Sequence, residues 1–326
     1  MDLFFQSAED LSSIFKSLGI GLDVSQLSAG SLRGRFQLTG SAVLPLMSIE
    51  TDQMLVCQGD RRPGFLPFSI NTRGDHPLVR GEEVSPLSIH GFQSSLKDSY
   101  FVLQPGCEIQ VAMVCKQRFQ RLAVATNEQR ALDRINSVNS AAVTPEQFQR
   151  LVELTKPQLH DPIQAELIEA ELLELLSDRR LSQLNGGDLS HRAGLMKDLI
   201  AWGQGNPTEV ISLEDLTTTI FASRSALVHS CRASSRLGPM DLLQQIRHGP
   251  LQAVLLNPQR RESLGLSTVQ AVATHFGFSS RNHFARDYRQ LFGEAPRETL
   301  QRSATPGIRS HPVSVAHRPQ MAMARR

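Results

Sequence analysis

The last third of the chain repeats one helix-turn-helix pattern, and this repetition constrains the fold more than any other feature of the sequence. In the first copy, Ser212 and Ser223 are placed to accept hydrogen bonds from the free backbone N–H groups at the start of two short helices. In the second copy Ser267 and Ser279 take these positions, and Gln270 completes a capping-box pattern with Ser267. The repetition predicts two compact units, each made of two helices joined by a tight turn.

Apolar side chains recur at helical spacing along one face of each predicted helix. They are Leu216, Ile220, Leu227 and Cys231 in the first unit and Val269, Val272, Ala273, Phe276, Phe284, Tyr288 and Leu291 in the second. Gly277 supplies a residue that tolerates a positive φ in the second turn. Burial of these faces leaves the outer face of each second helix free to enter a major groove of DNA.

The side chains predicted on these outer faces suit DNA recognition. Arg pairs with guanine, Asn pairs with adenine, and small apolar groups contact the thymine methyl. The expected DNA-binding residues are Ser223, Arg224, Ser225, Val228, His229 and Arg232 in the first unit and Ser280, Arg281, Asn282, Ala285, Arg286 and Arg289 in the second. No acidic residue occurs between Asp215 and Asp241 or between Glu262 and Asp287, which favours a surface that faces phosphates.

The chain from about residue 30 to 120 has the pattern of a β-rich region. Ile109, Val111, Met113 and Cys115 alternate along one run, which predicts a half-buried strand. Turn signals such as Arg62-Pro63-Gly64 separate runs of this kind. Short strands with frequent turns predict a small barrel or sandwich.

Between these two regions the pattern becomes helical. Asp161-Pro162 is a typical helix start. The apolar stripe that follows consists of Leu167, Ile168, Leu172, Leu175 and Leu176, with Glu166, Glu169, Glu171 and Glu174 predicted outside it. Such a helix either packs on its own domain or forms a dimer contact, and the residues alone leave both alternatives open. Asn185-Gly186-Gly187-Asp188 is the expected domain boundary.

These patterns predict an α+β chain in four parts. A β-rich domain occupies residues 1–130, a helical linker or dimerisation segment 131–187, the helix-turn-helix region 188–302 and a basic tail 303–326. The tail contains several prolines, no apolar periodicity and no acidic residue, which is typical of a disordered segment.

The run from Val269 to Pro296 closely resembles the C-terminal signature of AraC/XylS-type transcription regulators. The matching residues, in order, are Ala273, Gly277, Phe278, Ser279, His283, Phe284, Arg286, Tyr288, Phe292, Gly293 and Pro296. A weaker likeness through Leu213, Leu216 and Pro239 extends it over roughly 190–302. The resemblance implies a seven-helix, all-α module whose two recognition helices enter successive major grooves of specific DNA sites.

Three features depart from the family pattern. Cys231 stands where the family usually has Phe, and Arg236 replaces a usual Gly after the first recognition helix. Gly249-Pro250 falls inside the helix that should connect the two units. Because a proline inside a helix removes one hydrogen bond and clashes with the preceding turn, at a cost of roughly 3 kcal/mol, we expect an interruption or kink there.

The N-terminal region resembles, less specifically, the cupin-like ligand-binding domains that precede this module, which implies an unidentified small-molecule effector. His76 and His90 are isolated from each other, so neither a metal site nor another cofactor is expected. The four cysteines Cys57, Cys107, Cys115 and Cys231 are irregularly spaced and are expected to be reduced thiols.

The leading hypothesis is a bacterial transcription regulator, expected to be an activator, that binds double-stranded DNA in the cytoplasm at the nucleoid. RNA polymerase and a second copy of the chain are further candidate partners, whereas a membrane is not, because every apolar run is too short to span one. An enzyme with a DNA-binding tail is one alternative, but no Walker motif, G-x-S-x-G or metal cluster supports catalytic residues. A partner-binding platform is the other, and it predicts no sizeable apolar pocket in the N-terminal domain.

Overall fold

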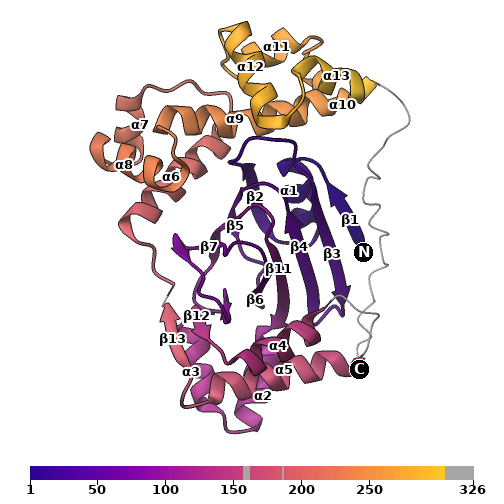
Figure 1. The fold of residues 1–326 in the computed structure, drawn as a ribbon, viewed down its shortest axis with the longest axis vertical. Coiled ribbons are helices and arrows are strands. Elements are labelled where there is room, and N and C mark those ends of the chain that lie inside the picture. The colour runs from indigo at the N-terminus through magenta and orange to yellow at the C-terminus, as the bar shows by residue number, and fades with distance from the viewer. Residues whose placement is uncertain (157–161, 186, 305–326) are drawn as a thin grey trace, which may run out of the picture.

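The computed structural model describes residues 1–156, 162–185 and 187–304 and confirms the predicted α+β class. A β-rich domain forms the N-terminal part, and a separate group of helices forms the C-terminal part (Figure 1). Asp161, the predicted helix start, and residues 305–326 of the predicted tail lie outside the described residues. Ser303 and Ala304 belong to the last helix rather than to a tail.

Two antiparallel sheets build the N-terminal domain. The larger sheet consists, in spatial order, of β1 (Asp2–Phe5), β3 (Gly34–Gly40), β4 (Pro45–Thr51), β11 (Glu108–Cys115), β6 (Phe65–Arg73), β9 (Ser88–His90), β12 (Ser140–Ala142) and β13 (Ser182–Asn185). The smaller sheet consists of β2 (Gly21–Gln26), β5 (Leu55–Asp60), β10 (Asp98–Leu103), β7 (Leu78–Val79) and β8 (Glu82–Glu83). This is the sandwich-like arrangement that the turn spacing predicts.

Strand β11 is buried on both faces, so the prediction of a half-buried strand was wrong. Ile109, Val111 and Met113 face a core shared with α1 (Ala8–Ser17) and the smaller sheet. Ala112 and Val114 face a second core on the other side, which helices cover. The covering helices bury a face that an isolated sheet would expose to water.

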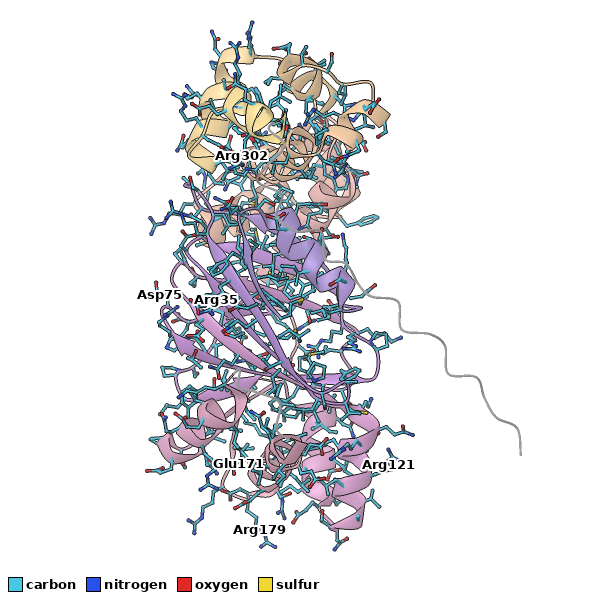
Figure 2. The ribbon with its side chains drawn as sticks, turned by 90° about the vertical axis from the view of Figure 1, so that its right-hand side faces the viewer. Arg35, Asp75, Arg121, Glu171, Arg179 and Arg302 are labelled. Atoms are coloured by element: carbon cyan, nitrogen blue, oxygen red, sulfur yellow. The ribbon has the colours of Figure 1, made fainter. Side chains whose placement is uncertain are left out.

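Four helices cover that second core: α2 (Lys116–Ala125), α3 (Gln129–Ser137), α4 (Pro145–Thr155) and α5 (Pro162–Ser177). Helix α5 buries Ile168, Leu172, Leu175 and Leu176 there, so it packs on its own domain, the first of the two predicted alternatives. Figure 2 shows Arg121 of α2 and Glu171 of α5 at the end of the molecule opposite Arg302.

Two residues of α5 lie on the opposite face from the one predicted. Leu167 is half exposed, whereas Glu169 is buried. The Glu169 carboxylate accepts a 2.6 Å hydrogen bond from Arg118 Nε on α2. Burial raises the pKa of Glu169, and the Arg118 charge opposes this shift. A cation on a neighbouring helix therefore makes burial of this carboxylate tolerable.

The C-terminal region contains eight helices between residues 187 and 304, one more than the resemblance implied. They are α6 (His191–Gly205), α7 (Leu213–Thr219), α8 (Arg224–Ser235), α9 (Pro239–Leu256), α10 (Pro258–Ser263), α11 (Val269–His275), α12 (Arg281–Phe292) and α13 (Pro296–Ala304). The additional helix is the short α10. Asn257 caps it by accepting a hydrogen bond from Arg260 N at 3.0 Å, and Pro258 occupies its first position.

Helix α9 continues through Pro250, so the predicted interruption was wrong, while the alternative of a kink stays a prediction. Leu242, Leu243 and Ile246 before the proline pack into the core of the first unit. Leu251 and Val254 after it pack into the core of the second. Burial of each such side chain contributes about 1.5–3 kcal/mol, and together they outweigh the roughly 3 kcal/mol that an internal proline costs.

Candidate nucleic-acid interface

The caps of the first unit are the predicted ones. Ser212 begins α7, and its Oγ accepts a hydrogen bond from Asp215 N at 3.1 Å. Ser223 begins α8, and its Oγ accepts a hydrogen bond from Ala226 N at 3.2 Å. Both helices of this unit therefore begin where the sequence predicts.

The caps of the second unit lie one residue later than predicted. Thr268, not Ser267, caps α11 by accepting a hydrogen bond from Ala271 N at 3.1 Å. Ser280, not Ser279, caps α12 through His283 N at 3.5 Å. Each cap is the last residue with an extended backbone before its helix, and this position decides which of two adjacent hydroxyls reaches the free N–H groups.

The two units adopt the same backbone conformation at their turns with different residues. Phe221 has a φ of +53°, and Gly277, at the matching place in the second unit, has a φ of +77°. After the recognition helices, Arg236 ends α8 at +62° and Gly293 ends α12 at +72°. The first unit thus holds two side-chain-bearing residues in the left-handed region that favours glycine.

Replacing Arg236 by Gly is expected to stabilise the first unit. The exposed Arg236 side chain forms no hydrogen bond or ion pair within the described residues, and glycine removes a backbone strain of about 1 kcal/mol. The measurement is the thermal midpoint of the full chain, which should rise. As a control, Ser235→Gly at the last residue of α8 should lower it, because it removes the hydrogen bond from Ser235 Oγ to Cys231 O and puts glycine into a helical position. A lower midpoint for Arg236→Gly would contradict the strain argument.

The inner faces of both recognition helices are buried as predicted. In α8, Leu227 and Cys231 are fully buried, so the smaller Cys231 still serves as a core residue. In α12, Phe284, Tyr288 and Leu291 are buried against α9 and α11.

His248 of α9 lies among the aromatic rings of the second unit. Its ring centroid is 4.5 Å from that of Phe278 and 5.9 Å from that of Phe284. Burial lowers the pKa of His248 to about 4, and its Nδ1 lies 2.8 Å from the carbonyl oxygen of Gln244, to which it donates. At neutral pH this histidine is an uncharged core residue.

Eleven of the twelve predicted DNA-binding residues are exposed, and Val228 is half-buried. Ser223 and Ser280 use their hydroxyls as helix caps. His229 Nε2 lies 3.2 Å from Nη2 of Arg192 on α6, which brings a further cation to the first unit. Local sequence patterns missed Arg192, because it is 37 residues away from His229 along the chain.

Arg286 differs from the other predicted residues of α12. Its Nε lies 3.0 Å from Asp287 Oδ1. It also lines a cavity of about 440 Å³ between α9, α12 and the N-terminal domain, together with Leu27 and Ala29. The structure therefore places Arg281, Asn282, Ala285 and Arg289 on the open side of α12 and Arg286 at the edge of a cleft.

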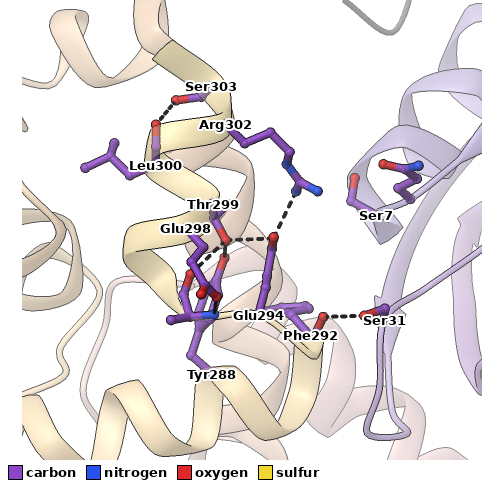
Figure 3. Close-up of polar contacts among 12 residues, drawn as sticks. Ser7, Ser31, Tyr288, Phe292, Glu294, Glu298, Thr299, Leu300, Arg302 and Ser303 are labelled. Atoms are coloured by element: carbon purple, nitrogen blue, oxygen red, sulfur yellow. Dashed lines mark hydrogen bonds and ion pairs between the residues drawn. The ribbon is translucent and has the colours of Figure 1, made fainter. Parts of the chain in front are cut away.

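The N-terminal domain binds the C-terminal end of α12. Residues 26–31, which we call the latch loop, supply three hydrogen bonds to the last carbonyl groups of this helix. Gly30 N and Gln26 Nε2 each donate to Leu291 O at 3.0 Å. Ser31 Oγ donates to Phe292 O at 3.0 Å (Figure 3). Carbonyl groups at a helix end have no partner within the helix, so the latch loop completes α12.

Next to the latch loop, a partly buried polar network joins α12 to α13. Tyr288 Oη donates to Thr299 Oγ1 at 3.0 Å, and Thr299 Oγ1 donates to Glu294 Oε1 at 2.7 Å. Arg302 Nη2 reaches the same Glu294 oxygen at 2.9 Å (Figure 3). Burial raises the pKa of Tyr288, so its hydroxyl stays protonated and can donate.

The first unit is attached to the N-terminal domain mainly through apolar contacts. Val56 and Tyr100 of the smaller sheet share a core with Met196 and Ile200 of α6. Gln204 Nε2 of α6 donates to Ser25 Oγ at 3.0 Å. Hydrogen bonds to the end of α12 attach the second unit, whereas the first is attached by an apolar core together with polar contacts of α6.

Comparison with known proteins decides the family. A family model described as a helix-turn-helix domain matches residues 216–302. The XylDLEGF operon transcriptional activator 2 of Pseudomonas putida is 27% identical over 136 residues, which cover 41% of this chain and 80% of that protein. The chain belongs to the AraC/XylS family of transcription regulators. It is therefore a DNA-binding transcription regulator rather than an enzyme.

Two solved structures each match about a third of this AraC/XylS-family regulator. A probable AraC family transcriptional regulator from Rhodopseudomonas palustris is 31% identical, and the match covers 33% of this chain and 96% of that one with a TM-score of 0.30. A transcriptional regulator with an AraC-type DNA-binding domain from Chromobacterium violaceum is 22% identical, covering 35% and 95% of the two chains with a TM-score of 0.30.

The described part of this AraC/XylS-family regulator holds neither a helix that could span a membrane nor a cluster of metal-ligating side chains. No helix there is both long and apolar enough to cross a membrane. No group of three or more His, Cys, Asp or Glu side chains there is arranged to hold a metal ion.

Proposed function

We propose that this regulator reads DNA with α8 and α12 in successive major grooves, through the twelve residues named above, within the region 188–302. The observation that carries the proposal is the pairing of two capped helices, each with an exposed polar face, across one continuous helix. The 18 residues of α9 span about 27 Å. This length is of the order of one turn of DNA, roughly 34 Å, so two adjacent grooves lie within reach.

Two further proposals are supported by the Pseudomonas putida relative and by the N-terminal domain. We propose activation of transcription, because the Pseudomonas putida relative is named an activator. We also propose control by a small molecule. The N-terminal domain holds an apolar-lined pocket of about 340 Å³, a feature that favours ligand binding over a purely partner-binding platform. A regulator of this kind works in the cytoplasm, where its DNA is.

Arg281→Ala is expected to weaken specific DNA binding by about 1–3 kcal/mol and to relax the preference for one base pair. Arg281 lies in the first turn of α12, is exposed and has no ion-pair partner within residues 187–304. Arg286→Ala should have the smaller effect, because Asp287 neutralises part of its charge and a cleft lies beside it. The measurement is selection of bound genomic fragments, followed by titration of the selected site at two salt concentrations.

Arg121→Ala is the matched control, because it removes one positive charge at the opposite end of the molecule (Figure 2). It should leave affinity unchanged. Equal affinities of Arg281→Ala and the unmodified chain would mean that α12 does not read bases. Binding without a preferred sequence, lost steeply with salt, would reduce the proposal to nonspecific attachment.

A further inference from the structure

Helix α9 has a weak point between the two helix-turn-helix units. Pro250 has no backbone N–H, so it cannot donate the helical hydrogen bond to the Ile246 carbonyl. The preceding Gly249 adds flexibility, and a Cβ at this position would contact nothing outside its own turn of the helix within 4 Å. A bend of α9 at this point would change both the angle and the distance between α8 and α12.

A segment of the first unit lies beside this weak point. Residues 206–210, which we call the brace, follow the end of α6 and precede α7. Asn206 N and Nδ2 both donate to Trp202 O at 2.9 Å, which fixes the start of the brace to α6. Ile211, directly after the brace, packs against the core of the first unit. The brace is therefore anchored in the first unit at both ends.

The middle of the brace contacts α9 and the second unit. Arg247 Nη2 of α9 donates a 2.6 Å hydrogen bond to Glu209 O. At the turn between α11 and α12, a Cβ on Gly277 would come within 2.6 Å of Val210 Cγ2 and 3.4 Å of Arg247 Nη1. Arg247 and the brace lie on the first-unit side of Pro250, and Gly277 lies on the second-unit side. The contact between them therefore closes across the weak point and opposes a bend toward the brace.

We propose that Arg247 and Val210 are positioning residues that set the spacing between the two DNA motifs that this regulator accepts. The inference rests on the proposed reading of DNA by α8 and α12, and it adds a determinant of specificity that need not touch DNA. Each base pair added between two motifs moves one by about 3.4 Å along the DNA axis and turns it by about 35°. A braced α9 cannot follow this shift, whereas an α9 that bends at Pro250 can follow part of it.

The test is titration of the full chain with duplexes that carry both selected motifs, either at the preferred spacing or with one base pair inserted or removed between them. The unmodified chain should lose at least about tenfold in affinity on either change, because one unit loses its base contacts. Arg247→Met keeps a long side chain but cannot donate, and it should lose less than about threefold. Arg247→Lys still donates and should keep most of the preference. Arg121→Met removes the same charge at the opposite end of the molecule and should behave like the unmodified chain (Figure 2).

Pro250→Ala tests whether the brace acts by preventing a bend. Alanine restores the backbone hydrogen bond and removes the proline clash, so α9 should stay straight without the brace. The double variant Pro250→Ala, Arg247→Met should therefore regain the loss of about tenfold on a change of spacing. Equal tolerance of altered spacing in Arg247→Met and in the double variant would overturn this account of the brace.

Duplexes with one motif intact and the other scrambled separate positioning from direct contact. A positioning residue leaves affinity for either single motif unchanged. Equal weakening by Arg247→Met on every duplex would mean that Arg247 contacts phosphate, and it would overturn the proposal.

Val210→Ala is the second variant, because Val210 is 71% exposed and its truncation cannot unfold a core. It should reduce the spacing preference by at least about twofold, and it decides the question if Arg247→Met also loses binding to single motifs. A two-motif site whose spacing preference survives both substitutions would overturn the role of the brace and leave the proposed reading of DNA standing. Selection that yields no two-motif site would overturn both.

Discussion

Replacing Phe284 by Ala is expected to unfold the second helix-turn-helix unit and to abolish specific DNA binding. The Phe284 side chain is 2% exposed, and its ring centroid lies 5.1 Å from that of Phe278 and 5.7 Å from that of Tyr288. Truncation leaves a cavity among these rings at a cost of about 3–5 kcal/mol. Because the core of this unit is small, a loss of that size is comparable to the stability of a whole domain.

Urea unfolding followed by circular dichroism, together with DNA titration, measures this effect. Phe221→Ala is the matched control. Phe221 is 95% exposed, so the same truncation there removes no core contact. It should therefore leave the urea midpoint of unfolding unchanged. A Phe284→Ala protein that unfolds at the same urea concentration as the unmodified chain would show that α12 does not pack through this ring.

Local patterns predicted the parts of the fold that local interactions decide. The inner face of α12 follows from the spacing of Phe284, Tyr288 and Leu291, because helix geometry alone places these side chains together. The caps show the limit of such reasoning. Thr268 and Ser280 each directly follow a serine whose hydroxyl could also cap the helix. Only the backbone conformation selects which of the two adjacent residues caps it.

Tertiary contacts decided the features that the patterns missed. Pro250 stays inside α9, because cores on both sides of it hold the helix together. Glu169 is buried, because Arg118, which lies 51 residues earlier, compensates its charge. The latch loop reaches α12 across 265 residues, from Gln26 to Leu291. No spacing rule reports a contact of that separation, so the link between the two domains is visible only in the structure.

One ion-pair cluster between the domains is centred on the Asp98 carboxylate. Asp98 of β10 accepts a hydrogen bond from Lys197 Nζ of α6, and Arg80 Nη1 lies 3.5 Å from its other oxygen. Arg80 is buried, and its Nε and Nη1 make no hydrogen bond with the described residues. Burial and the nearby Arg80 charge lower the pKa of Arg61 to about 10. Positive charges therefore outnumber negative ones around Asp98.

Asp98→Asn is expected to destabilise the chain by about 3 kcal/mol at pH 7, because it leaves Arg80 buried and Lys197 without a partner at the domain boundary. Burial alone would raise the pKa of Asp98, but Lys197 and Arg80 together lower it below 3.8. A lowered pKa contributes stability above pH 3.8 that is lost as the pH falls through the folded value, so the difference from the unmodified chain should shrink below about pH 4. Urea unfolding between pH 3 and pH 7 measures this difference in unfolding free energy.

Asp23→Asn is the control, because it breaks the exposed pair with Lys16 and should cost under about 1 kcal/mol. If Asp98→Asn costs no more than this control, Asp98 does not hold the helix-turn-helix region on the N-terminal domain.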